Sequence, residues 1–173
     1  MTYLGEYTKG EASILHNLIL SQKEFDMPCI ADFFAYELSV ILREKLPLDV
    51  REKEYIVSAV PRSKRSMNKY GFNQSASLAK RLAFHLGLDY YELLSYKGDD
   101  TTQKNLSVNE RFENADNSYR IKKNSKKLIN RHSVILVDDV YTTGATLASC
   151  SELIAECGSN RIDCAVIGKS SKK

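Results

Sequence analysis

The sequence predicts an α/β fold in which a mainly parallel central sheet is flanked by helices. Residues 134–137 and 55–60 are short, largely apolar runs rich in β-branched side chains, the pattern of strands buried on both faces of a sheet. A helical apolar pattern follows each run, over residues 74–86 and from Leu147 onward. Strands that alternate with helices along a chain are typical of a parallel sheet with helices on both faces.

Two helices are expected before the first of these strands. Residues 10–24 and 28–46 both carry apolar side chains at helical spacing. Pro28 suits the first turn of the second helix and Pro47 suits its end, while Asp26 is a plausible N-cap.

The middle of the chain is expected to continue as loop, helix and strand. Residues 62–73 show no apolar period and are interpreted as a loop. Asn73 is a candidate N-cap for the helix over 74–86, and Gly87 suits the end of that helix. Residues 88–96 are interpreted as a strand.

The remaining elements are shorter, and each is placed by its local pattern. The predicted order is a loop over 97–102, a short helix over 107–114, a polar connection over 122–131, the strand at 134–137, a helix that ends at Gly158, and a final strand over 161–167.

Length and composition indicate one globular domain. The 173 residues suit a single unit, 1–173, in which an N-terminal helical segment (1–48) precedes a core (49–173). The net charge of +3 is too small to argue for nucleic acid by itself. No apolar run approaches the length of a membrane span and the start does not resemble a secretory signal, so we expect a cytoplasmic protein.

The cysteines do not indicate a metal site. Cys29, Cys150, Cys157 and Cys164 form no C-x-x-C pair, so a zinc site is not expected from them. Buried, unpaired thiols in a reducing compartment are the interpretation that fits them.

The stretch after the 134–137 strand has the chemistry of a sugar-phosphate site. Asp138 and Asp139 follow the strand, at the edge where open α/β sheets bind ligands, and are expected to face solvent there. Residues 142–146 (Thr-Thr-Gly-Ala-Thr) form a hydroxyl-rich turn that leads into a helix, where unpaired N–H groups favour an anion. Carboxylates accept hydrogen bonds from hydroxyls, so we infer a sugar 5-phosphate with free 2- and 3-hydroxyls. The alternative is a turn whose threonines only cap the helix.

Residues 134–146 resemble the phosphoribosyl-pyrophosphate (PRPP) motif of type I phosphoribosyltransferases. The resemblance implies that family's fold, with a mobile hood loop over the active site, and makes 49–173 a PRPP-binding core. It also implies that Asp138 and Asp139 hold the ribose hydroxyls and act in catalysis. The 5-phosphate would be bound by Thr142, Thr143, Gly144, Ala145 and Thr146.

A second candidate stretch directly follows the 55–60 strand. Pro61, Arg62, Ser63, Lys64 and Arg65 form a cationic turn suited to a second anion such as pyrophosphate. The alternative is a basic surface loop. Residues 60–74 resemble the ComF/GntX-like branch of the phosphoribosyltransferases, in which this region forms the pyrophosphate loop.

The third stretch resembles a further pattern of that branch, and the resemblance makes it the hood. It is carried by Thr101, Thr102, Gln103, Leu106, Ser107, Arg111 and Asn114. Gln103 is the substrate-binding candidate and Arg111 the catalytic one. A closing segment suits this chemistry, because water would capture an oxocarbenium-like centre. For Arg111 a solvated surface arginine is the alternative.

The resemblance covers about residues 3 to 168 and implies transfer of phosphoribosyl from PRPP, with Mg²⁺ held mainly by PRPP. One feature departs from the branch, whose members commonly carry a four-cysteine zinc module ahead of the stretch that begins here at Tyr3. Two other functions stay open: a DNA-uptake (competence) factor for single-stranded DNA, and a PRPP sensor without turnover. Competence proteins and a second copy of the chain stay open as partners. The sequence does not identify the acceptor.

Overall fold

A five-stranded parallel sheet forms the centre of the protein, in a computed structural model that describes residues 1–7, 14–25, 27–46, 54–97 and 118–170. The strand order is β1-β7-β6-β2-β3, and every neighbouring pair is parallel. The strands are β1 (Thr2–Tyr7), β2 (Tyr55–Ala59), β3 (Asp89–Tyr90), β6 (Ser133–Tyr141) and β7 (Ile162–Ser170). The predicted α/β class is confirmed.

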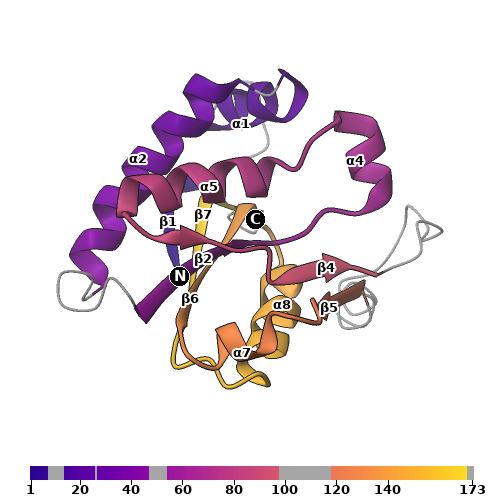
Figure 1. The fold of residues 1–173 in the computed structure, drawn as a ribbon. Coiled ribbons are helices and arrows are strands. Elements are labelled where there is room, and N and C mark those ends of the chain that lie inside the picture. Colours follow the sequence, from indigo (N-terminus) through magenta and orange to yellow (C-terminus); the bar gives the residue numbers. More distant parts are fainter. Residues whose placement is uncertain (8–13, 26, 47–53, 98–117, 171–173) are drawn as a thin grey trace.

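Helices cover both faces of this sheet (Figure 1). On one face lie α1 (Ile14–Phe25), α2 (Pro28–Lys45) and α5 (Gln74–Leu86), and on the other α7 (Lys126–Ile129) and α8 (Ala145–Ala155). Side chains of β6 alternate between the two cores: Ile135 packs with α2 and α5, whereas Leu136 packs with α8. A continuous apolar run is therefore what this central strand requires.

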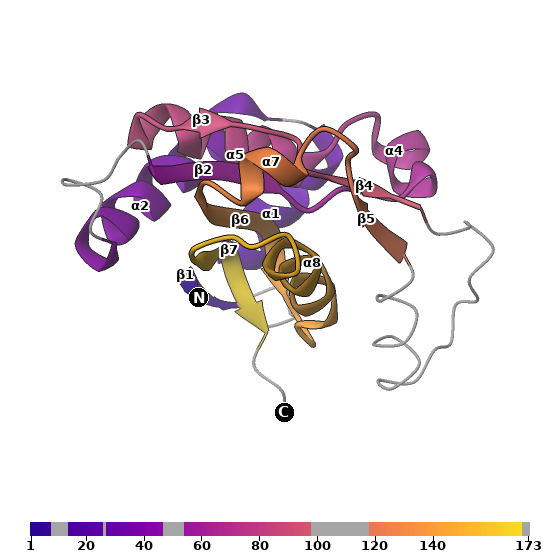
Figure 2. The same cartoon turned by 60° about the horizontal axis from the view of Figure 1, so that its bottom comes forward.

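A second, two-stranded sheet stands beside the first (Figure 2). It pairs β4 (Leu94–Tyr96) with β5 (Tyr119–Ile121) in antiparallel fashion. The single strand predicted at 88–96 is thus wrong. Its first part, β3, pairs with β2, after which the chain leaves the edge of the main sheet, and its last part pairs with β5.

The loop predicted over 62–73 contains a helix, α4 (Lys64–Tyr70). The Ser63 hydroxyl caps it by accepting a hydrogen bond from the Ser66 N–H at 3.1 Å, and Gly71 ends it at a φ of +78°. Most of its described residues are exposed or only partly buried, so the helix buries no continuous apolar stripe. The periodicity rule therefore could not detect it.

The capping residues of α5 and α2 test two further predicted helix ends. Helix α5 spans the predicted 74–86, with the Asn73 side chain accepting from the Ala76 N–H and Gly87 at a φ of +72°. The N-cap of α2 is Met27, without a side-chain bond, so the cap predicted at Asp26 is wrong. The N-terminal segment is also not purely helical, because β1 forms an edge of the central sheet.

The connection predicted over 122–131 contains α7, and the final strand continues beyond 167 to Ser170. The loop at 98–102 and the helix at 107–114 lie outside the described residues. In the part that is described, no helix is long and apolar enough to cross a membrane.

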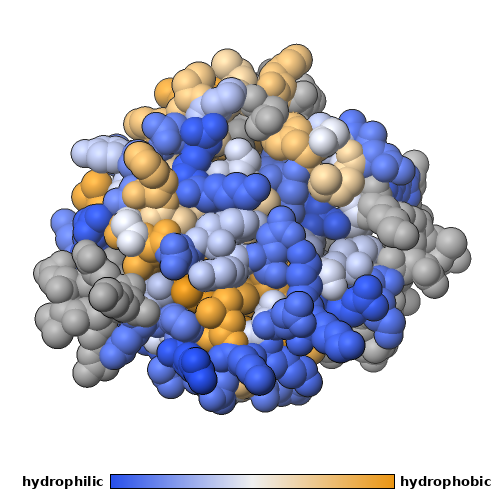
Figure 3. All heavy atoms as spheres, in the orientation of Figure 1, coloured by the Kyte–Doolittle hydropathy of each residue, from blue (hydrophilic) through white to orange (hydrophobic). Residues whose placement is uncertain are grey.

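The surface is mixed in character. Figure 3 shows hydrophobic groups at the top and at the left, the sides on which α1 and α2 lie in Figure 1, and a smaller hydrophobic area in the lower centre that hydrophilic groups surround. The exposed apolar side chains of these two helices include Ile14, Phe25 and Phe33.

Candidate active site

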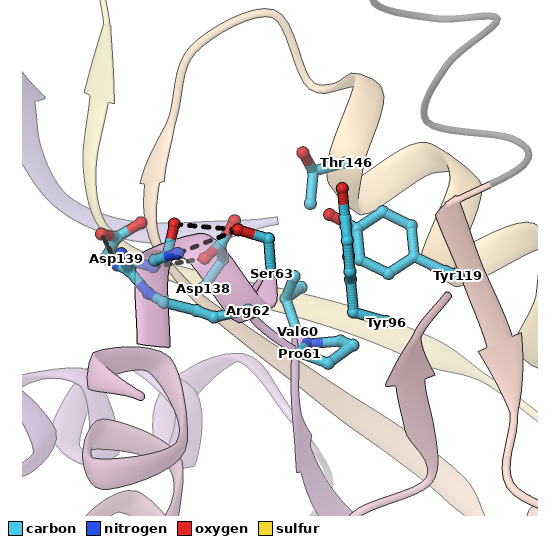
Figure 4. A pocket seen from close by; sticks show the side chains of 10 residues that line it. Val60, Pro61, Arg62, Ser63, Tyr96, Tyr119, Asp138, Asp139 and Thr146 are labelled. Atoms are coloured by element: carbon cyan, nitrogen blue, oxygen red, sulfur yellow. Dashed lines mark hydrogen bonds and ion pairs between the residues drawn. The ribbon is translucent and has the colours of Figure 1, made fainter. Parts of the chain in front are cut away.

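A cavity of about 360 Å³ opens at the carboxyl ends of β2 and β6. Figure 4 shows the acid pair, Arg62 and Ser63 on one side of it, with two tyrosines and Thr146 on the other. Its lining residues are Val60, Pro61, Arg62, Ser63, Ser66, Tyr96, Tyr119, Asp138, Asp139 and Thr146. The cavity joins segments that lie far apart in the sequence, at the edge where a parallel sheet binds ligands.

The register of the sheet explains why the acids reach this cavity. Strand β6 does not end at Val137 as predicted but continues to Tyr141, still paired with β7. On its other side β2 ends at Ala59, opposite Val137. From Asp138 onward that side of β6 therefore has no strand neighbour, and the turn that follows β2 lies beside the acids.

Asp139 forms an ion pair with Arg62, which belongs to the proposed pyrophosphate turn at residues 61–65. Its Oδ2 accepts a hydrogen bond from Arg62 Nη2 at 2.7 Å, and its Oδ1 accepts from the Val140 N–H at 2.8 Å. Asp139 is 8% exposed. The expectation that both carboxylates face solvent is therefore wrong for this residue, because the arginine covers it.

Asp138 has a different environment. Its Oδ1 accepts hydrogen bonds from the Ser75 hydroxyl and from the Asp139 N–H, each at 2.9 Å. Burial, followed by the neighbouring Asp139 carboxylate, raises the pKa of Asp138 from 3.8 to about 7, although both hydrogen bonds and Arg62 act in the opposite direction. A perturbed carboxyl group in a cavity is a common feature of functional sites.

The turn before α8 has the backbone geometry that its glycine predicts. Gly144 is the N-cap residue, at a φ of +83°. The dihedral angle favours glycine, and a Cβ added there would lie 2.5 Å from the Tyr141 hydroxyl oxygen, so any other residue would also displace the end of the Tyr141 side chain. The Thr143 Oγ1 accepts from the Ala145 N–H at 3.4 Å, so capping by a threonine also occurs.

The structure brings only some of the predicted phosphate and pyrophosphate residues to the cavity wall. Thr146 lines the cavity, whereas Thr142, Thr143, Gly144 and Ala145 do not. Arg65 is exposed and is also absent from the lining. Gln103, Arg111 and the side chain of Lys64 lie outside what the structure describes.

Two lining residues that the sequence did not indicate are Tyr96 and Tyr119. They face each other across β4 and β5, with ring centroids 5.6 Å apart and an interplanar angle of 79°. Burial raises the pKa of the Tyr119 phenol well above its usual range, and the neighbouring Thr146 hydroxyl acts in the opposite direction. Both strands are three residues long, too short for a periodic signal.

The chain belongs to the phosphoribosyltransferase family, because the model of the phosphoribosyl transferase domain matches residues 68–173. Among curated proteins it is similar to the DNA utilization protein YhgH of Salmonella typhi and of Escherichia coli K12, each 28% identical over 90% of this chain. The matched region spans 65% of the length of either relative. The predicted family is confirmed, and these relatives agree with the predicted branch.

Solved structures show the same fold. A hypoxanthine phosphoribosyltransferase from Staphylococcus aureus is similar with a TM-score of 0.50 and 17% identity, over 95% of this chain and 84% of that one. An allosteric regulatory enzyme of purine biosynthesis gives a TM-score of 0.52 and 16% identity, over 86% of this chain and 30% of that one. The protein thus has the type I phosphoribosyltransferase fold.

Proposed function

We propose that the chain binds PRPP and transfers its phosphoribosyl group to a nitrogenous acceptor, with release of pyrophosphate. The observation that supports this most is the single cavity in which the 61–63 turn, the acid pair and Thr146 meet. In this proposal the acid pair addresses the ribose hydroxyls and residues 142–146 bind the 5-phosphate. The 61–65 turn binds pyrophosphate, and Gln103 and Arg111 belong to a segment that closes over the ligand.

The chain's own residues would act by binding and by charge. Loss of pyrophosphate from the ribose C1 leaves positive charge on the sugar, which carboxylates beside it stabilise. Tyr96 and Tyr119 form one wall of the cavity, against which the sugar or the acceptor could pack.

Magnesium fits this site as an ion held mainly by PRPP. Carboxylate oxygens of the kind that Mg²⁺ accepts line the cavity, but the described residues include no group of three His, Cys, Asp or Glu side chains that could hold a metal ion. When bound, Mg²⁺ would neutralise charge on the leaving pyrophosphate.

Isothermal titration with PRPP and Mg²⁺ tests the binding part of this proposal. Saturable binding is expected, and the absence of binding would overturn the proposed function. A screen for pyrophosphate release with purine and pyrimidine bases then tests turnover. Binding without release for any base would favour the PRPP sensor over the enzyme.

A second candidate function is a DNA-uptake role that uses single-stranded DNA. The name of the relatives, DNA utilization protein, favours it. Helix α4 adds a suitable surface, since the Tyr70 ring lies 4.6 Å from Lys69 Nζ and 6.0 Å from the Arg62 guanidinium carbon. Grooves that combine cations with aromatic rings bind single strands.

Fluorescence anisotropy with a labelled oligonucleotide at low and physiological salt separates the two functions. We expect weak binding that fades with salt, because the net charge is only +3 and the acids in the cavity oppose phosphates. Lys69→Ala should reduce it, and Lys127→Ala, on the distant α7, serves as the control. Tight binding that persists at physiological salt would place the DNA role first.

A further inference from the structure

The two adjacent acids differ in which of their oxygens are engaged by the protein. Asp139 uses both: Oδ2 pairs with Arg62 and Oδ1 accepts from the Val140 N–H. Its side chain is 11% exposed and that of Arg62 16%. The Arg62 side chain and the low exposure of both partners leave a ligand hydroxyl little access to the Asp139 carboxylate. Displacing this short ion pair to gain access would be costly, because it leaves a largely desolvated charge without its partner.

Both hydrogen bonds from the protein to the Asp138 carboxylate go to the same oxygen, Oδ1. Ser75 and the Asp139 N–H both donate to Oδ1. Within the described part of the chain, Oδ2 has no hydrogen-bond partner. Because Asp138 lines the cavity whereas Ser75 does not, the contact with Ser75 leaves Oδ2 as the oxygen available to a ligand.

Ser75 is a buried residue whose hydroxyl is directed at Asp138. It lies in the first turn of α5, is 1% exposed, and its hydroxyl donates to the carboxylate across 63 residues of sequence. Two donors on one carboxylate oxygen fix the rotamer of the side chain. The N-terminus of α5 adds favourable potential for a negative charge.

We propose that Asp138 alone presents a carboxylate oxygen to the ribose hydroxyls, that Ser75 positions it, and that Asp139 instead anchors Arg62 beside the pyrophosphate loop. This inference rests on the proposed function and divides a role that the family motif assigns to both acids. The raised pKa of Asp138 is compatible with it, since the protonated acid can donate to a hydroxyl and the ionised one can accept.

The test compares Asp138→Asn with Asp139→Asn, using ribose 5-phosphate as the probe because it lacks pyrophosphate and so does not depend on Arg62. We expect Asp138→Asn to weaken ribose 5-phosphate binding about tenfold or more while the melting temperature at pH 7.5 stays equal or rises. Asp139→Asn should lower the melting temperature, because it leaves Arg62 without its partner, yet change ribose 5-phosphate affinity less than about threefold.

Ser75→Ala tests the positioning role, with Ser77→Ala on the same helix as the matched control. Ser75→Ala should weaken ribose 5-phosphate binding about three- to tenfold. It should also move the midpoint of the pH dependence of stability to higher pH, because the hydrogen bond that is lost favours the ionised form of Asp138. A merely structural serine would change stability without moving that midpoint, and this result would overturn its role.

The outcomes separate the inference from the function on which it rests. If the wild-type chain binds PRPP but both Asn variants lose ribose 5-phosphate equally, the division of roles is wrong and the function stands. The same holds if Asp138→Asn binds as the wild type does. If the wild-type chain binds neither ligand, the proposed function and this inference both fail.

Discussion

Gly144 combines a left-handed backbone angle with a close neighbouring side chain. Its positive φ disfavours any L side chain, and the Tyr141 ring occupies the place of a Cβ. Gly71 has a similar φ of +78° but no atom within 4 Å of an added Cβ. Substitutions at Gly144 and Gly71 therefore distinguish the free-energy cost of the backbone angle, which both share, from the cost of crowding against Tyr141, which only Gly144 has.

Gly144→Ala should weaken ribose 5-phosphate binding and destabilise the protein more than Gly71→Ala does. Both variants incur about 1 kcal/mol for the left-handed backbone, and only the first also disturbs the turn ahead of α8. Thermal unfolding and isothermal titration measure the two effects. Equal binding by Gly144→Ala and the wild type would mean that the turn is only a helix cap.

The acid at 138 should give the protein a recognisable pH dependence. Its pKa is raised in the folded state, so the folded protein binds the proton more tightly, and the stability that this contributes is complete below the unfolded pKa of about 4. That contribution is lost as the pH rises through about 7. The other titratable groups that interact with Asp138 are Asp139, Arg62, Tyr119, Cys150 and Cys164.

Melting temperatures between pH 5 and 8 check this expectation. The wild type should lose stability across the range relative to Asp138→Asn, in which the titrating group is absent. Parallel curves for the two proteins would contradict a raised pKa at this position.

Helix α4 connects a local capping interaction to the pyrophosphate turn. Its cap is the Ser63 side chain, and Ser63 and Ser66 both line the cavity. Ser63 therefore both begins the helix and forms part of the proposed anion site. Helix stability and pyrophosphate binding should change together.

Ser63→Ala should cost about 1 kcal/mol in local stability and speed hydrogen exchange in α4. PRPP affinity should fall, while ribose 5-phosphate affinity stays nearly constant, because only the former carries pyrophosphate. Ser125→Ala is the matched control, since Ser125 occupies the N-cap of α7 without a side-chain cap bond. Equal loss of both ligands in Ser63→Ala would argue against a pyrophosphate role for this turn.

The N-terminal segment and the core share one structure in the molecule as a whole. Strand β1 pairs with β7, and α2 packs against α5 through a common apolar core. We therefore propose that residues 1–48 and 49–173 unfold as one unit.

Leu38→Ala tests whether the two segments unfold together, because Leu38 is fully buried where α2 packs into the shared core. A loss of about 2–5 kcal/mol is expected, in a single transition seen alike by circular dichroism and by tyrosine fluorescence. Val40→Ala, on the same helix but 42% exposed, should change stability little. Two separate transitions would indicate that the segment and the core are independent.

The sequence by itself determined the parts whose physics is local. The helical spacing of apolar residues predicted α2 and α5, and four consecutive apolar residues predicted the first half of β6. Gly144 indicated the turn ahead of α8. These patterns depend on neighbours along the chain, so they can be read without coordinates.

Only the tertiary structure decided which side chains meet. The contacts of Arg62 with Asp139 and of Ser75 with Asp138 join residues 77 and 63 positions apart. The tyrosine pair of β4 and β5 depends on a strand pairing that no local pattern encodes. Strand register brings these groups together, and register is set by packing across the whole sheet rather than by the residues at the site.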